Sequence, residues 1–105
     1  MASIFTKIIN REIPSDIVFE NDTIIAIKDI NPQAKTHLLI IPKKEIPTIN
    51  DIEKEDTQLI ADLFFVAKQL ASELSISEWY KLHFNVGEKW WQEVMHIHLH
   101  LLSNI

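Results

Sequence analysis

The chain has 105 residues, of which 47% are hydrophobic and 24% are charged, and its formal net charge is −5. This length is typical of a single compact core, so we expect one domain over residues 1–105. No apolar run approaches the ~20 residues that cross a bilayer, which argues against a membrane protein. The acidic balance argues against polynucleotide binding, because proteins that bind nucleic acid present a basic face to the phosphates.

The chain has no cysteine, which excludes disulfides, iron–sulfur clusters and thiolate zinc sites. Its first segment, MASIFTKIINREIP, has no basic stretch followed by a long apolar core, so we do not interpret it as a secretory signal. Together these features predict a cytoplasmic location.

Apolar residues recur every three or four positions in two segments, as in amphipathic helices, and β-branched or alternating runs predict strands elsewhere. In chain order we expect a helix over 3–13, strands over 16–21, 23–30 and 36–42, a helix over 52–74, and strands over 80–86 and 94–102. Ser3 is the expected N-cap of the first helix, Asn50 with Glu53 is the expected capping box of the second, and Asn21-Asp22 is the expected hairpin turn. This order predicts an α+β fold with a five-stranded antiparallel sheet, one short N-terminal helix and one long central helix.

Three of the five histidines lie in the last predicted strand, in the stretch VMHIHLHLL. Alternate side chains of a strand share a face, so His96, His98 and His100 are predicted to point one way. The apolar residues between them are predicted to point into the core. From the rise of a strand, neighbouring histidines lie roughly 7 Å apart and the outer two about 13 Å apart.

The residues alone leave three interpretations of this row open. In the first, neighbouring histidines bind zinc, but the outer pair is too far apart to share one ion, so His37, Asp29 or Glu93 would have to supply a further ligand. In the second, a neutral imidazole attacks phosphorus while its neighbours donate hydrogen bonds to phosphate oxygens. In the third, the histidines are half-buried surface residues without chemistry.

The motif HIHLHLL occurs together with DINPQA, THLLIIPK and a lead-in of the form N.G....Q.V. With these motifs the chain resembles the histidine triad (HIT) superfamily, specifically its Hint branch of nucleotide-binding hydrolases, over nearly its whole length. The resemblance implies a homodimer that cleaves purine nucleoside phosphoramidates or related nucleotidyl esters, with no required metal or other cofactor.

The resemblance also implies a mechanism and a catalytic set. A histidine attacks the α-phosphorus, a nucleotidyl-histidine intermediate forms, and water then releases the nucleoside monophosphate. Carried over by position, His98 is the nucleophile and His100 contacts the phosphate and the leaving group. His96 supports the polar network of the strand, and His37 orients His98.

The same resemblance implies a nucleotide-binding set. Asp29 matches the acidic residue that holds the ribose hydroxyls, with Ile30 beside it, and Asn85 matches an asparagine on the phosphate side. Gln92 lies in the implied phosphate loop. His83 has no family role that can be carried over, and we expect it to be structural or exposed.

The chain departs from the family pattern in that loop. Trp90 and Trp91 stand where glycine is usual, Trp91 at the position whose backbone would contact the phosphate, and Glu93 stands where serine or threonine is common. The indoles can lie outward, stack on the base or leaving group, or fill the pocket. An alternative function follows: a nucleotide-binding or interaction module with weakened catalysis.

Overall fold

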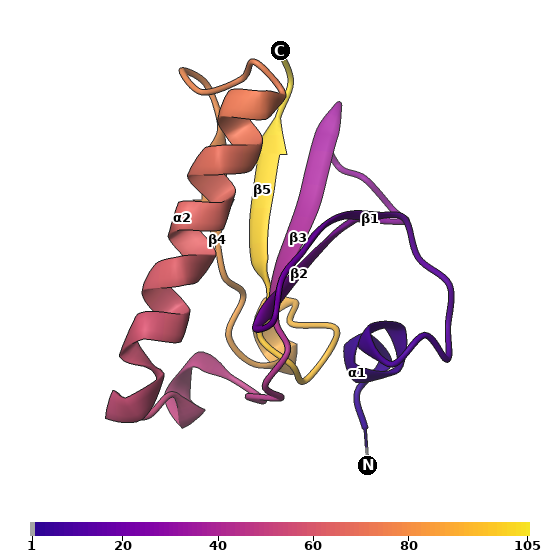
Figure 1. Ribbon diagram of the computed structural model, residues 1–105, viewed down its shortest axis with the longest axis vertical. Helices are drawn as coiled ribbons and strands as arrows, with labels where there is room; N and C mark the ends of the chain where they lie inside the picture. The colour runs from indigo at the N-terminus through magenta and orange to yellow at the C-terminus, as the bar shows by residue number, and fades with distance from the viewer. Residues whose placement is uncertain (1) are drawn as a thin grey trace.

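The computed structural model describes residues 2–105, in which a five-stranded antiparallel sheet is combined with a short and a long helix (Figure 1). The elements are α1 (Ile4–Ile9), β1 (Ile17–Glu20), β2 (Ile24–Lys28), β3 (Thr36–Pro42), α2 (Thr57–Glu73), β4 (Lys81–His83) and β5 (Leu99–Ser103). Three short 3₁₀ turns are η1 (Ile49–Asp51), η2 (Lys54–Asp56) and η3 (Glu88–Trp90). The strand order is β1-β2-β3-β5-β4, which confirms the predicted α+β class and the five-stranded sheet.

The two helices lie on opposite faces of the sheet, α2 on one and α1 on the other (Figure 1). Successive side chains of a strand point to opposite faces, so each strand contributes residues to the hydrophobic cores on both faces of the sheet. In β3, Leu38 and Ile40 pack in the core that contains α2, whereas Leu39 and Ile41 pack in the core that contains Phe5 of α1. The same alternation decides where polar side chains of β3 and β5 point.

In β5, Leu99 and Leu101 belong to the core under α2. His100 lies between them and therefore points to the opposite face, where α1 covers only part of the sheet. His37 of β3 shares that face with Leu39. The sheet thus brings two histidines, 63 residues apart in the sequence, to one polar surface.

The hairpin between β1 and β2 and the start of α1 are confirmed. The side chain of Asn21 accepts hydrogen bonds from the backbone N–H of Thr23 and of Ile24, as expected of a turn asparagine. Ser3 caps α1 by accepting from the N–H of Thr6. The helix is shorter than predicted because Arg11 has a left-handed backbone, with a φ of 63°.

The predicted start of the long helix is wrong. Capping boxes form at Thr48 with Asp51 and at Glu53 with Asp56, and α2 begins only at Thr57. Asp56 is 4% exposed and accepts a hydrogen bond from Lys44 at 2.6 Å, which fixes this corner. The acidic run before α2 therefore caps two short turns instead of forming the first turn of the helix.

The predicted last strand is wrong over its first half, since β5 begins at Leu99 and not at residue 94. The neighbouring strand β3 ends at Pro42, which has no N–H to donate to a continuing ladder. The carbonyl of Pro42 accepts from the ring of His96, and the N–H of Ile97 donates to the carbonyl of Ile46. His96 and His98 consequently precede the strand, and only His100 lies within it.

Within residues 2–105, no helix combines the length and the apolar character needed to pass through a bilayer.

Candidate active site

His96 is fully buried and has a fixed tautomer. Its Nε2 lies 2.7 Å from the carbonyl oxygen of Pro42, and its Nδ1 lies 2.7 Å from the hydroxyl of Ser3. A carbonyl only accepts, so Nε2 carries the proton and Nδ1 accepts from the Ser3 hydroxyl. This arrangement joins the N-terminus of α1 to the end of β3 and leaves His96 no ring nitrogen for a ligand.

His98 has the opposite tautomer. Its Nδ1 lies 2.8 Å from the carbonyl oxygen of His96 and must donate to it. The proton on Nδ1 leaves Nε2 of the neutral ring with a free lone pair. The ring packs edge to face against Phe5, with centroids 5.0 Å apart, so its orientation is fixed by both packing and hydrogen bonding.

His37 does not orient His98, contrary to the prediction; its partner is His100. The N–H of Gln33 donates to Nδ1 of His37 at 3.1 Å, which places the proton of the neutral ring on Nε2. That Nε2 lies 3.0 Å from Nδ1 of His100. The strand register explains the difference, because β3 pairs with β5 only from Leu99 onward.

His100 is therefore a hydrogen-bond donor at its other nitrogen. Because Nδ1 accepts from His37, the proton of the neutral His100 ring lies on Nε2. This Nε2 is buried and has no hydrogen-bond partner among the residues that the structure describes. A buried unpaired donor costs about 1–3 kcal/mol, so such a group is expected where a ligand supplies the acceptor.

The rings of His98 and His100 lie 4.8 Å apart, centroid to centroid. A nitrogen lone pair and a free N–H donor are thus placed side by side. This is the pair that transfer of a phosphoryl group requires: one group to attack phosphorus and one to bind its oxygens or the leaving group.

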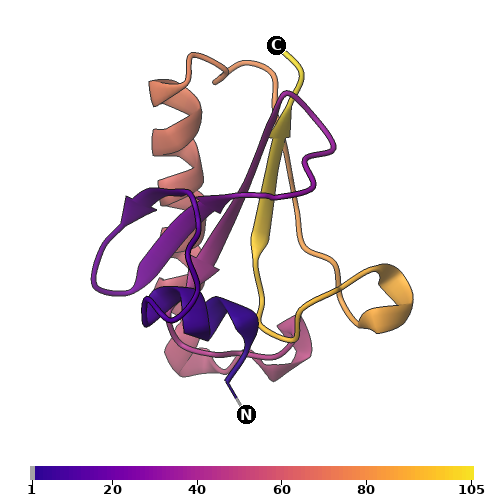
Figure 2. The same ribbon diagram turned by 90° about the vertical axis from the view of Figure 1, so that its right-hand side faces the viewer.

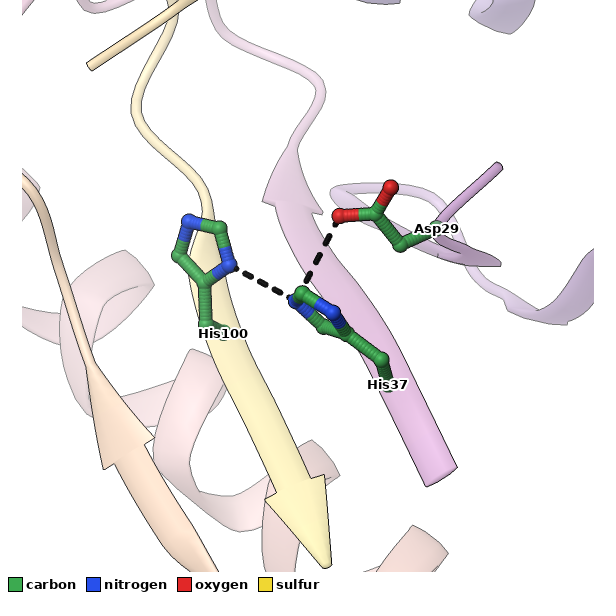
Figure 3. A group of neighbouring side chains, drawn as sticks. All are labelled: Asp29, His37 and His100. Carbon is green, nitrogen blue, oxygen red and sulfur yellow. Dashed lines mark hydrogen bonds and ion pairs between the residues drawn. The ribbon is translucent and has the colours of Figure 1, made fainter. Parts of the chain in front are cut away.

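Asp29 follows β2 and extends the row of polar groups. One carboxylate oxygen accepts from the N–H of Asn31 at 2.9 Å, and the other lies 3.4 Å from Nε2 of His37 (Figure 3). The carboxylate is half-buried. Ile30, the neighbouring predicted site residue, is 88% exposed.

The loop between β4 and β5 projects from one end of the molecule (Figure 2). Trp90 and Trp91 are 69% and 68% exposed, so the interpretation in which the indoles fill the pocket is wrong. They pack edge to face on each other, with centroids 5.1 Å apart. Trp91 has a φ of 65°, in the left-handed region that favours glycine, and its N–H donates to the carbonyl of Glu88.

The remaining predicted loop residues hold the loop or lie at its surface. Gln92 is 2% exposed and bonds only to backbone groups, accepting from Gly87 and donating to Pro47 and Val94. Asn85 donates to the carbonyl of Trp91 at 3.4 Å. The side chain of Glu93 is exposed.

His83, which was expected to be structural or exposed, packs against His100. The residue lies directly opposite His100 in the β4–β5 pairing, and the two rings stack with an interplanar angle of 3° and centroids 4.5 Å apart. Its place in the alternating stretch YKLHFNV indicated a strand, but only the pairing register shows which residue it faces. All five histidines of the chain thus lie in or beside one cluster.

Comparison with known proteins identifies the family. The family model described as "Scavenger mRNA decapping enzyme C-term binding" matches residues 2–105. A HIT family hydrolase from Legionella pneumophila Philadelphia 1 superimposes with a TM-score of 0.96 at 51% identity, covering 99% of this chain and 94% of that chain. The chain belongs to the histidine triad family. A HIT family hydrolase from Clostridium thermocellum is also similar, with a TM-score of 0.94 at 43% identity over 98% of this chain and 90% of that chain.

Among curated relatives, the HIT chain is 50% identical over 102 residues to a purine nucleoside phosphoramidase of Escherichia coli strain K12. The match covers 96% of this chain and 86% of the relative. A HIT-like protein of Synechocystis is 46% identical over 101 residues, which is 96% of this chain and 89% of that protein. These relatives confirm the resemblance that the motifs indicated.

Burial favours the neutral form of His96, His98 and His100 near pH 7. It lowers the pKa values of His96 and His98, against the opposing effect of the carbonyl that each ring bonds. Burial, and next the neighbouring His98 ring, lower the pKa of His100 to about 3. The neutral state is the one in which His98 Nε2 has a lone pair for attack on phosphorus.

The donor atoms of Asp29, His37 and His100 lie within 4.8 Å of one another, a spacing that can hold a metal ion (Figure 3). The tautomer of His37 opposes this use. A neutral histidine that binds metal through Nε2 normally donates an N–H from Nδ1, whereas Nδ1 of His37 accepts from the backbone of Gln33. The proton of His37 therefore lies on Nε2, where the ion would have to bind, and this donor set does not fit a metal.

A cavity of about 390 Å³ lies between the ends of β2 and β3 and the C-terminal part of α2. Asp29 and His37 line it, together with Leu70 and Leu74 of α2, but none of the three motif histidines does. This cavity therefore does not identify the reacting site. The free nitrogens of His98 and His100 are a better guide, because they carry the chemistry.

Proposed function

We propose that this chain is a hydrolase of nucleoside phosphoramidates or related nucleotidyl esters. The proposal is supported by the HIT family membership and by the 50% identity to a purine nucleoside phosphoramidase. The observation that carries it is the pair of opposite tautomers, with the lone pair on His98 Nε2 beside the N–H of His100 Nε2.

In the first step, the lone pair of His98 Nε2 forms a bond to the α-phosphorus. The bond from phosphorus to the leaving nitrogen or oxygen breaks, and the leaving group departs with a proton taken from solvent, while the Nε2–H of His100 donates a hydrogen bond to a phosphate oxygen. The developing charge on the phosphate oxygens is stabilised by this N–H, which acts strongly because it is buried.

In the second step, water attacks the phosphorus of the nucleotidyl-histidine. The bond between phosphorus and His98 Nε2 breaks, a proton of the water is released to solvent, and the nucleoside monophosphate is released. Burial supports this cycle, because a neutral His98 is both the nucleophile and the leaving group regenerated at the end.

The nucleoside is proposed to lie against Asp29, whose carboxylate would accept two hydrogen bonds from the ribose diol, with Ile30 at the rim. Asp29 also lies 3.4 Å from Nε2 of His37, so the groups proposed to bind ribose and to orient His100 form one row of polar contacts. Asn85, Trp91, Gln92 and Glu93 are proposed to form the phosphate-side loop. Purine is the base class that the resemblance implies, and AMP is then the expected product from an adenosine substrate.

We further propose that residues 1–105 act as one domain and assemble as a cytoplasmic homodimer that needs no metal. The absence of cysteine supports a reducing compartment. Phe64 and Phe65 of α2 and Trp79 beyond it are exposed, and exposed aromatic side chains of this kind support a contact with a second copy.

The second candidate function is a nucleotide-binding module with weak catalysis. It is favoured by one observation, the left-handed backbone of Trp91, whose N–H donates within the loop to the carbonyl of Glu88. In that state the amide does not face a phosphate. Glu93 adds a carboxylate that would repel the substrate if ionised.

The test is incubation with adenosine 5′-phosphoramidate, with AMP release compared between the parent protein and His98→Ala. The hydrolase predicts release by the parent that the variant lacks. If the parent releases no more AMP than the variant while calorimetry shows that it binds AMP, the binding module is the correct function.

A further inference from the structure

His83 is the one histidine of the cluster to which neither the proposed reaction nor the hydrogen bonds described above give a role. It ends β4 and lies opposite His100 in the strand pairing. The two rings are parallel within 3°, at a centroid distance of 4.5 Å. This is the separation of offset-stacked aromatic rings, so the face of the His83 ring lies against the face of the His100 ring.

The stack completes the restraint on His100. A hydrogen bond from His37 at 3.0 Å fixes one atom of the His100 ring, Nδ1, but leaves the plane of the ring free to tilt about that atom. A parallel ring against one face removes this freedom. The direction in which Nε2–H points is therefore set by two contacts together, one from β3 and one from β4.

We propose that His83 is a positioning residue whose ring, stacked on His100, aims the Nε2–H of His100 at the reacting phosphate. The proposal rests on the hydrolysis proposed above. His83 itself touches no reacting atom, so its effect on the reaction passes through His100.

The charges around the stack are compatible with this role. The titratable groups that act on it are Lys81 of β4, His37 of β3, and His98 next to β5. Burial, and then the positive charge of Lys81, lower the pKa of His83, and burial also lowers that of His100. Both rings are neutral near pH 7, so no repulsion between like charges opposes the stack.

The experiment compares the parent with His83→Phe, which keeps a flat ring, and His83→Leu, which removes it. Hydrolysis of adenosine 5′-phosphoramidate is measured from pH 5 to 9, and NMR of the imidazole nitrogens reports the tautomer of His100. For His83→Leu we expect kcat to fall about tenfold with KM little changed, because the misaimed donor acts mainly in the transition state. For His83→Phe we expect kcat within about threefold of the parent.

A purely structural role would not move the pKa of His100. His83→Phe removes a titratable neighbour of His100, so a nitrogen NMR titration should show the pKa of His100 rising from about 3. In His83→Leu the nitrogen spectrum should show His100 exchanging between its two tautomers, whereas the parent and His83→Phe show Nε2–H alone.

Two results would overturn the proposal: His83→Leu with an unchanged kcat and an unchanged His100 spectrum, or His83→Phe losing as much kcat as His83→Leu. If circular dichroism shows that His83→Leu does not fold, His83→Phe decides alone, since loss of its kcat contradicts a role of the flat ring and retention supports it. The proposed function fails separately, when the parent is no faster than His98→Ala. In that case the nitrogen spectra of the resting proteins still test the stack.

Discussion

For His98 and His37, one hydrogen bond to the backbone determines which ring nitrogen carries the proton. A carbonyl forces the proton of His98 onto Nδ1, and an amide N–H forces the proton of His37 onto Nε2. Because Nε2–H of His37 donates to Nδ1 of His100, the proton of the His100 ring lies on Nε2, which is then a donor. The same ring chemistry thus gives a nucleophile at one position and a donor at the next, with the difference set by neighbouring peptide groups.

Ser3 supports this arrangement from α1, and its removal is the first test. The Ser3 hydroxyl caps the helix and donates to the buried Nδ1 of His96, so Ser3→Ala removes a cap and leaves a buried acceptor unpaired. We expect the free energy of unfolding to fall by about 1–3 kcal/mol, measured by urea denaturation. Ser77→Ala, an exposed serine in a turn, is the matched control and should change it by less than about 0.5 kcal/mol. Equal effects of the two substitutions would contradict the account of His96.

Trp91 and Glu93 offer a second test, of whether the loop between β4 and β5 limits catalysis. Glycine adopts the left-handed backbone of Trp91 without a Cβ penalty and lets the loop rearrange toward a phosphate, while serine removes a nearby negative charge. We expect the double variant Trp91→Gly, Glu93→Ser to release AMP faster from adenosine 5′-phosphoramidate, by about tenfold in kcat/KM. An unchanged rate would mean that this loop does not limit catalysis.

Among the helices and strands, the sequence predicted those boundaries that depend on local residue patterns. It did not predict the boundaries and contacts that depend on residues far apart in the chain. Strand β3 has the predicted ends, and the hairpin turn is at Asn21, because both depend on local β-branched runs and turn chemistry. The histidine strand was predicted too long, since its alternation continues through His96 while its partner strand ends at Pro42. The stack of His83 on His100 depends on pairing register, which no local pattern encodes.

The hydrogen bonds that hold the loop between β4 and β5 can be tested by substituting Gln92. Gln92 joins it to the rest of the fold through hydrogen bonds to Gly87, Pro47 and Val94. Methionine has a similar size but cannot make these bonds, so Gln92→Met should lower the free energy of unfolding by about 2 kcal/mol and speed amide hydrogen exchange at Gly87. Gln69→Met, on the exposed face of α2, is the control. Unchanged exchange in Gln92→Met would show that another contact holds the loop.

For the whole molecule, the buried histidines make stability depend on pH in an unusual range. The pKa values of His83, His96, His98 and His100 are all lowered from the ordinary value of 6.5. The unfolded chain therefore takes up protons before the folded one does. Their contribution to stability is present above pH 6.5 and is lost as the pH falls toward the folded pKa values, down to about 3 for His100.

We expect the free energy of unfolding, from urea titrations, to decrease steadily as the pH falls from 7.5 to 5. Carboxylates alone would give a decrease that begins only near pH 4.5, where unfolded aspartate and glutamate start to bind protons. The slope between pH 7 and 5 should be smaller in His100→Gln than in the parent. A stability that is flat between pH 7 and 5 would contradict the burial of neutral histidines.

The covalent step is the central claim, and the mass of the protein during turnover tests it most directly. The parent is mixed with adenosine 5′-phosphoramidate, quenched in base because a phosphorus–imidazole bond is acid-labile, and digested for mass spectrometry. The account predicts one added adenylyl group on the peptide that contains His98, absent in His98→Ala. AMP release at the parent rate by His98→Ala, or an adenylyl group on any other residue, would contradict it.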